Sequence, residues 1–354
     1  MRIGGMFPLE EFEEKKKNSF FKENYLGDLK FLLSGRCAIY YCLLDISPIK
    51  NKTAYLPAYN CETVVESYLK AGWDCLFYDV DKENLQPIYK DDDLEHIGLV
   101  NICGYYGFHH RNQEFLKKCK DRGIIILQDS TFAPYSINPY ADYVAGSFRK
   151  WMGIASGGIA LKRNGNFKKN PKSIDQNHLD GRLKAMEYRK KAILEGAEEY
   201  NEIALKTFWD TELSFRKTFG EFISDQLSIN ILYHFDFKNM KNKRVENYNT
   251  ITSSLNESSY FKPVFNFDLE ENDCPSHFSL YVENREKLKS YLLNNGINST
   301  TYWPLPPFLK NSINKFPNAK YIYEHILSIQ LDQRYSKDDM NFLVKVLNMY
   351  VLNY

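Results

Sequence analysis

Apolar and polar positions alternate along residues 28–163 in a pattern that predicts strands separated by helices. Short apolar runs bounded by turn residues indicate buried strands, and longer stretches with apolar residues three or four positions apart indicate helices. This alternation is typical of βαβ units, in which a mainly parallel sheet is covered on both faces. The predicted strands begin at Tyr55 and cover Cys75–Asp79, Gly98–Cys103, Ile124–Gln128, Asp142–Ser147 and Gly158–Lys162, and the predicted helices are Asn60–Ala71 and Asn112–Arg122.

The rest of the chain shows two other patterns. Residues 165–250 are polar and predict two surface helices, Leu183–Asn201 and Phe208–Phe222. The pattern then changes and predicts the strand Phe278–Val282, the helix Arg285–Asn294, the strand Ile326–Leu331 and a terminal helix from Lys337. We therefore expect a large α/β domain over residues 1–250 and a small C-terminal α+β domain over residues 251–354.

The overall composition gives no reason to expect a nucleic-acid or membrane partner. The 354 residues carry a formal net charge of +1, which gives no electrostatic reason to expect a nucleic acid. No apolar run approaches the roughly 18 residues that span a bilayer, and the mixed-charge start does not resemble a secretory signal. The seven cysteines are an odd number, so reduced thiols are the simplest interpretation. We predict a cytoplasmic protein with no membrane partner.

Two features that could suggest a metal site do not support one. The pair His109-His110 lies in a loop and would need convergent partners to hold a metal. The cysteines Cys37, Cys42 and Cys61 lack the Cys-x-x-Cys spacing of zinc sites. We predict that the protein holds no metal.

Three candidate positions come where ligands bind in open α/β sheets, outside the carboxyl ends of the strands. Asp129 follows the strand Ile124–Gln128, and its carboxylate could pair with a protonated pyridine nitrogen. Lys150 follows the strand Asp142–Gly146 closely, and its amine could form a Schiff base. The stretch Ser34-Gly35-Arg36-Cys37 opens a helix, whose free amides suit a phosphate.

Each of these positions also has an ordinary structural interpretation. Asp129 could cap a turn, Arg149 and Lys150 could be a surface pair at a strand end, and Ser34 could be a plain N-cap. Their combination, in this order and at these spacings, favours a pyridoxal phosphate (PLP) site over three unrelated structural roles.

At this point the chain resembles the fold-type-I PLP enzymes, and more narrowly the DegT/StrS (DegT/DnrJ/EryC) family of sugar aminotransferases. The resemblance covers nearly the whole length, and the spacing of Asp129 and Lys150 is its most informative part. The other matching segments are Leu56–Cys61, Phe77–Asp81, Val100–Gly104, Leu127–Thr131, Asn295–Ile297, Tyr302–Pro304 and Tyr335–Asp339.

The resemblance implies a fold and a set of residue roles. It implies a fold-type-I PLP-dependent transferase, with a large mainly parallel-sheet domain and a small C-terminal α+β domain. The implied roles are Lys150 as the Schiff-base lysine, Asp129 on the ring nitrogen, Thr131 and Tyr59 against the two ring faces, and Ser147, Gly35, Arg36 and Cys37 at the phosphate. Tyr302 and Trp303 are candidates for substrate contacts, although this stretch could also be a structural loop. Members of the family are homodimers with shared active sites, and residues between Tyr188 and Tyr248 could complete the partner's site.

The sequence departs from the family pattern at three positions. The family usually places its lysine five positions after the serine, whereas Lys150 follows Ser147 by three. Phe132 stands where the family has a polar residue that contacts the ring hydroxyl, so this hydroxyl needs another partner. Trp151, directly after the lysine, is a candidate for narrowing the substrate pocket.

The resulting hypothesis is a PLP-dependent aminotransferase that moves an amino group from glutamate to a nucleotide-linked keto-sugar, for polysaccharide or glycan biosynthesis. Two alternatives stay open. One keeps PLP but changes the reaction to elimination, dehydration or decarboxylation. The other is a catalytically silent binding subunit with the same fold, against which the presence of both Lys150 and Asp129 argues.

Overall fold

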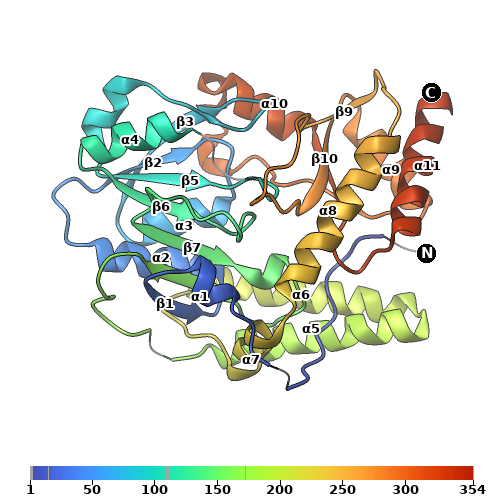
Figure 1. Ribbon diagram of the computed structural model, residues 1–354, viewed down its shortest axis with the longest axis horizontal. Coiled ribbons are helices and arrows are strands. Elements are labelled where there is room, and N and C mark those ends of the chain that lie inside the picture. The colour runs from blue at the N-terminus through green and yellow to red at the C-terminus, as the bar shows by residue number, and fades with distance from the viewer. Residues whose placement is uncertain (1–2, 15, 109–111, 172, 354) are drawn as a thin grey trace.

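Two β-sheets of different size organise the chain, as Figure 1 shows. The computed structural model describes residues 3–14, 16–108, 112–171 and 173–353. The larger sheet has eight strands in the order β1-β8-β7-β6-β5-β2-β3-β4, and the smaller has four in the order β11-β12-β10-β9. No helix in these ranges is both long enough and apolar enough to cross a membrane.

The centre of the larger sheet is parallel and its edges are antiparallel. Strands β7, β6, β5, β2 and β3 pair in parallel, whereas β1, β8 and β4 join them in antiparallel pairs. The expected mainly parallel sheet is confirmed. The strands are β1 (Asp28–Leu32), β2 (Thr53–Pro57), β3 (Asp74–Val80), β4 (Pro87–Ile88), β5 (Leu99–Cys103), β6 (Ile125–Asp129), β7 (Tyr143–Ser147) and β8 (Gly158–Lys162).

Both faces of this sheet are buried. Neighbouring residues along each strand point to opposite faces, so each strand contributes to two cores. In β6, for example, Leu127 packs into the core with the helices α2 (Gly35–Ile46) and α3 (Glu62–Lys70). Its neighbour Ile126 packs into the second core, which includes the helix α4 (Gln113–Asp121) and the smaller sheet. Two apolar faces explain why the central strands read as continuous apolar runs in the sequence.

The segment between the two sheets is helical. Its helices are α5 (Gln176–Glu195), α6 (Glu198–Thr218), α7 (Gln226–His234) and α8 (Phe237–Ser254). Helices α5 and α6 lie side by side as a long hairpin that extends from the body of the protein in Figure 1. The expected helix Leu183–Asn201 is wrong in one respect, because the chain turns at Gly196. Gly196 has a φ of +67°, a left-handed conformation that ends helices and that glycine adopts without strain.

The C-terminal part forms the small α+β unit that the pattern predicts. Its strands are β9 (Phe261–Pro263), β10 (His277–Val282), β11 (Ser299–Thr300) and β12 (Ile326–Gln330), and its helices are α9 (Arg285–Asn294), α10 (Pro317–His325) and α11 (Lys337–Asn353). Helix α8 packs against α11 although most of α8 precedes residue 251. The boundary at residue 250 therefore remains a prediction, and it falls inside α8.

Candidate functional site

Three strands bring the candidate residues to one edge of the large sheet. β1 and β7 both run antiparallel to β8, so they point the same way, and β6 runs parallel to β7. The carboxyl ends of β1, β6 and β7 consequently meet at the same edge. Asp129 ends β6, Ser147 ends β7, and Ser34 follows β1 at the start of α2.

The Asp129 carboxyl is buried and lacks a cationic partner among the described residues. Its Oδ1 accepts a hydrogen bond from the Thr131 N–H at 2.9 Å. Burial raises the pKa of Asp129, and the contacts with Thr131 oppose this rise. A buried carboxylate is costly unless a positive group compensates it. A protonated pyridine nitrogen would supply that charge, so Asp129 fits the role implied by the resemblance.

Lys150 ends a single 3₁₀ turn, Phe148–Lys150, directly after β7. Its side chain retains solvent-exposed surface, yet protein groups surround it closely enough that loss of water is the main effect lowering its pKa. Cys61 and Glu212 oppose this effect, and Arg149 and Arg182 add to it. An amine with a lowered pKa is more often neutral, which is the state that attacks a carbonyl carbon.

Close backbone approach builds a cradle between Ser147 and the start of α2. A Cβ on Gly35 would lie 3.2 Å from the Ser147 Cβ, and a Cβ on Gly158 would lie 2.2 Å from the Ser34 oxygen. Glycine at both positions therefore allows the start of α2 to rest on the end of β7. The side chain of Ser34 caps α2 by accepting the Cys37 N–H at 3.3 Å. The cradle thus presents the amides of Gly35 and Arg36, together with the Ser147 hydroxyl.

Three arginines converge on the single carboxylate of Glu212 beside this cradle. Arg149 pairs with Glu212 Oε1, Arg182 Nη1 lies 3.4 Å from the same oxygen, and Arg36 Nη2 lies 4.0 Å from Oε2. Burial lowers the pKa of His178, the fourth neighbour of Glu212, to about 3, so it is neutral at pH 7. Three guanidinium groups outnumber the one carboxylate, and Glu66 offsets the charge of Arg36 only in part, so an excess of positive charge remains. We call Arg36, Arg149, Arg182, His178 and Glu212 the arginine cluster.

The arginine cluster contains unsatisfied donors. Arg36 Nε and Nη1 and Arg182 Nε are buried and have no hydrogen-bond partner in the described parts of the chain. Buried unpaired guanidinium groups are costly, so an anion is expected beside them. A phosphate monoester, which carries close to two negative charges at neutral pH, suits this excess of positive charge. The residues present therefore fit the phosphate of PLP.

The aromatic residues of the candidate site lie in the loop after β11. The Tyr302 ring lies 5.9 Å from the Lys150 Nζ, which brings the small unit to the lysine. Trp303 packs 5.2 Å from the ring of Tyr59. Tyr59 itself is fully buried and donates its hydroxyl to the Tyr302 carbonyl oxygen. Tyr59 therefore contacts Tyr302, and Tyr302 in turn lies beside Lys150.

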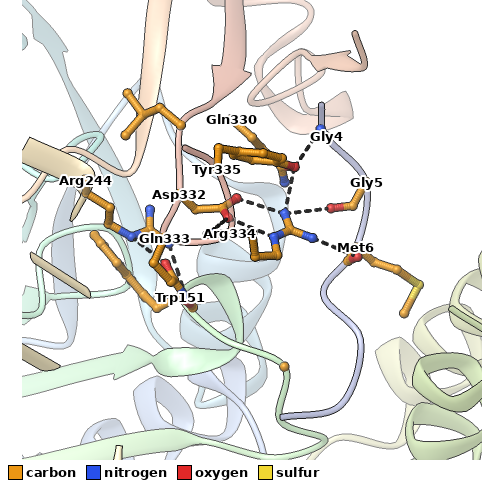
Figure 2. A network of polar contacts seen from close by, with 12 residues as sticks. Gly4, Gly5, Met6, Trp151, Arg244, Gln330, Asp332, Gln333, Arg334 and Tyr335 are labelled. Atoms are coloured by element: carbon orange, nitrogen blue, oxygen red, sulfur yellow. Dashed lines mark hydrogen bonds and ion pairs between the residues drawn. The ribbon is translucent and has the colours of Figure 1, made fainter. Parts of the chain in front are cut away.

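Trp151 does not line a pocket, and its expected role in narrowing one is wrong. Its side chain is fully buried, and its Nε1–H donates to the Thr131 carbonyl oxygen at 2.7 Å. The Arg244 guanidinium stacks on its ring at 4.6 Å and donates through Nη2 to its carbonyl oxygen at 3.3 Å. Gln333 donates to the same oxygen at 2.7 Å. Figure 2 shows Arg244 and Gln333 meeting at Trp151, so this residue braces the turn that carries Lys150.

The structure brings most of the candidate residues together and adds others. Asp129, Thr131, Ser147 and Lys150 share one sheet edge with the start of α2. The thiol of Cys37 is buried in the core, and its amide is engaged by Ser34. Sequence reasoning missed Arg182, Glu212, Arg244 and His277. These come from segments whose polar residues looked like solvated surface, and no spacing in the sequence links them to Lys150.

No group of metal-ligating side chains is present in residues 3–14, 16–108, 112–171 and 173–353. The pair His109-His110 lies outside the described residues.

Comparison with known proteins places the fold. No protein-family model matches the sequence, and no curated protein matches it. Among solved structures, PseC of Helicobacter pylori, an aminotransferase involved in pseudoaminic acid biosynthesis, matches with a TM-score of 0.72 and 13% identity over 100% of both chains. A DegT DnrJ EryC1 StrS aminotransferase of Brucella abortus matches with a TM-score of 0.60 and 14% identity, over 94% of this chain and 88% of its own.

A third solved structure is of a neighbour in its PLP form. A Streptococcus pneumoniae protein assigned as a sugar aminotransferase, in its PLP form, matches with a TM-score of 0.65 and 13% identity over 99% of both chains. At these identities the likeness establishes the fold. The expected fold-type-I architecture is confirmed, and the family suggested by the sequence is represented among the structural neighbours.

Proposed function

We propose that this protein is a PLP-dependent aminotransferase. The observation that carries the proposal is the position of Lys150 and Asp129 at the ends of two adjacent parallel strands, next to a cradle with an excess of positive charge. A carboxylate, an amine with a lowered pKa and an anion site are the three groups that PLP requires. The likeness in fold to aminotransferases agrees with this combination.

Each group of the chain has a distinct task in this proposal. When bound, PLP would supply an aldehyde for the lysine amine and a ring that accepts electrons from the substrate. Asp129 would keep the ring nitrogen protonated, and Lys150 would move a proton to and from the substrate carbon. Ser147, Gly35 and Arg36, backed by the arginine cluster, would hold the phosphate. Cys37 is the weakest of the phosphate candidates, because Ser34 engages its amide.

The proposed substrates are glutamate as amino donor and a nucleotide-linked keto-sugar as acceptor, in polysaccharide or glycan biosynthesis. Tyr302 lies beside Lys150, and both Tyr302 and its neighbour Trp303 are partly exposed. Aromatic rings with a polar edge suit a sugar ring. Several structural neighbours are sugar aminotransferases, which supports this choice over elimination or decarboxylation.

We further propose a homodimer with shared active sites. The α5–α6 hairpin exposes large apolar side chains, and Trp209 and Leu213 lie one helical turn apart with 60% and 58% of their surfaces exposed. Exposed apolar stripes of this kind mark protein interfaces. The arginine cluster uses residues of the same two helices, so a partner covering the hairpin would also shield the phosphate site.

A cytoplasmic location completes the proposal. All seven cysteines are free thiols, and five of them are buried: Cys37, Cys42, Cys103, Cys119 and Cys274. Free thiols persist in the reducing cytoplasm and form disulfides in oxidising compartments.

The visible spectrum of the purified protein tests the proposal. Added PLP should give an absorption band that requires Lys150, and glutamate should convert the cofactor to its amine form with loss of that band. A band that persists in Lys150→Ala protein would refute the lysine assignment. A band that forms normally but does not respond to any amino donor would favour a silent binding subunit or another PLP reaction.

A further inference from the structure

His277 is a buried histidine of the small sheet that faces the candidate site. It begins β10, and its ring packs edge-on against Tyr302 at 5.0 Å and against Phe132 at 6.1 Å. Its Nδ1 lies 3.0 Å from the Ser276 hydroxyl. Within the described ranges no residue hydrogen-bonds to its Nε2. One ring nitrogen of His277 is therefore available to a ligand.

The same histidine is close to Lys150. Tyr302 contacts both residues, because its ring lies 5.9 Å from the Lys150 Nζ and 5.0 Å from the His277 ring. Burial is the main effect that lowers the pKa of His277, to about 3, and the charge of Lys150 contributes to this shift. His277 is thus a neutral imidazole at physiological pH, with one nitrogen that carries a proton and one that does not.

Phe132 explains why the site needs a polar group at this place. It follows Thr131, whose N–H donates to the Asp129 carboxyl. Its ring is buried and packs among four others, those of Tyr106, His277, Tyr302 and Trp303. A phenyl ring can neither donate nor accept a strong hydrogen bond. The ring hydroxyl of PLP would be ionised when the cofactor is bound to the lysine, and an ionised oxygen needs a donor.

Arg244 fixes the position of His277 relative to Lys150. Its Nη1 donates to the Ser276 carbonyl oxygen at 3.1 Å, and its Nη2 donates to the Trp151 carbonyl oxygen at 3.3 Å. Ser276 precedes His277 and Trp151 follows Lys150, so one guanidinium connects the two functional turns. In Figure 2 Arg244 lies against Trp151 beside Gln333, which donates to the same carbonyl group.

We propose that His277 donates its Nε2–H to the ring hydroxyl oxygen of the lysine-bound cofactor, in the place where Phe132 offers no donor. The Ser276 hydroxyl then donates to Nδ1 and selects the tautomer with its proton on Nε2. The inference rests on the proposed function, since the cofactor must be bound for the contact to exist.

The charged and titratable groups around His277 favour this neutral donor. Arg244, Lys150 and Arg334 oppose protonation of the imidazole, whereas Asp332 favours it. Tyr302 and Tyr106 face the ring from other elements, and burial raises the pKa of both phenols. Because protein side chains do not absorb visible light, a pH-dependent transition in the visible spectrum belongs to the lysine-bound cofactor.

A pH titration of the visible absorption tests the proposal in the PLP-loaded protein. The variants are His277→Phe, which removes the donor, and His277→Gln, whose side-chain amide places an N–H near the position of Nε2. His325→Phe is the matched control, because His325 stacks on Tyr321 and its Nδ1 lies 2.8 Å from the Tyr321 carbonyl oxygen of its own helix.

Loss of a donor to an ionised oxygen should raise the transition pH of His277→Phe by about one unit. PLP binding should weaken about tenfold in the same variant, measured at equilibrium without substrate. His277→Gln should stay close to the parent protein, and His325→Phe should match it. Should His277→Phe fail to fold, Ser276→Ala should still raise the transition pH, because Nδ1 loses the donor that fixes the tautomer.

Two different failures can be told apart. An unchanged transition pH in His277→Phe, or in Ser276→Ala where that variant replaces it, overturns the role of His277 and leaves the proposed function standing. A parent protein that forms no Lys150-dependent band overturns the proposed function itself, and the role of His277 with it.

Discussion

The indole N–H of Trp151 donates to the carbonyl oxygen of Thr131 at 2.7 Å. Trp151 follows Lys150, and Thr131 binds the Asp129 carboxyl through its own N–H at 2.9 Å. One buried hydrogen bond therefore ties the turn that carries the amine to the turn that carries the acid. Because both turns leave adjacent strands, the separation of Lys150 and Asp129 is set by rigid parts of the fold.

Replacing Trp151 by Phe should loosen this connection. The Thr131 carbonyl oxygen would lose its buried partner, which should lower the free energy of unfolding by about 1 to 2 kcal/mol. The rate of the half-reaction with glutamate should fall, while PLP still binds. Urea unfolding and stopped-flow absorbance measure the two effects. Trp73→Phe is the matched control, since Trp73 is also buried but its Nε1 has no hydrogen-bond partner in the described parts of the chain, and equal effects in both variants would contradict the role of Trp151.

Asp129→Asn should change the cofactor-free and cofactor-bound proteins in opposite ways. Burial raises the folded-state pKa of Asp129, so its carboxyl contributes stability at low pH that is lost as the pH rises through that pKa. The cofactor-free variant should therefore be more stable than the parent at pH 7, and the difference should shrink as the pH falls through the raised pKa and level off at about pH 4. Thermal unfolding at several pH values checks this.

The same variant should bind PLP but react with glutamate at least about 100-fold more slowly, because an amide cannot hold a proton on the ring nitrogen. Near-normal turnover would contradict the assignment of Asp129. A cofactor-free variant that is less stable than the parent at pH 7 would contradict the absence of a cationic partner.

Glu212→Gln should leave three buried guanidinium groups without a carboxylate. Burial alone would raise the pKa of Glu212, but Arg149 and Arg182 outweigh it and hold the pKa far below its usual range. Its stabilising effect is therefore present above the ordinary pKa of a glutamate and is lost only in strong acid. We expect the cofactor-free variant to lose about 3 kcal/mol of stability at pH 7.

Phosphate should stabilise both the parent protein and Glu212→Gln, because an anion bound in the arginine cluster offsets its excess positive charge. Differential scanning calorimetry with and without inorganic phosphate measures this, and a larger gain for Glu212→Gln is expected. Glu114→Gln is a control at an exposed carboxylate. A thermal midpoint that phosphate does not shift in either protein would contradict an anion site.

The α5–α6 hairpin predicts a concentration-dependent assembly. The double variant Trp209→Asp and Leu213→Asp should convert a dimer into a monomer and weaken PLP binding, because charge on an apolar interface is costly. Light scattering measures the mass. Leu352→Asp, at a leucine of α11 that is even more exposed, should leave the dimer intact. A parent protein that is monomeric at all concentrations would refute the shared site.

The sequence predicted the parts of the site that follow directly from the order of the strands. Asp129, Ser147 and Lys150 could be found because buried strands are recognisable as apolar runs, and residues at their carboxyl ends meet at one edge. The short edge strands β1 and β4 and the turn at Gly196 were missed, since local propensity is weak there.

The remaining site residues could not be predicted because they act through tertiary contacts. Arg182 and Glu212 look like ordinary charges on polar helices, and only the packing of α5 against α6 brings them to Arg36. His277 and Arg244 lie far from Lys150 in the sequence, and a chain of contacts through Tyr302 and Trp151 joins them to it.

The most direct test of the central claim is reductive trapping of the cofactor on the lysine. PLP-loaded protein treated with borohydride should carry one phosphopyridoxyl group, and peptide mass spectrometry should place it on Lys150. Lys150→Ala protein treated in the same way should carry none. A label on another lysine, or an unlabelled Lys150 in protein that shows the visible band, would contradict the account.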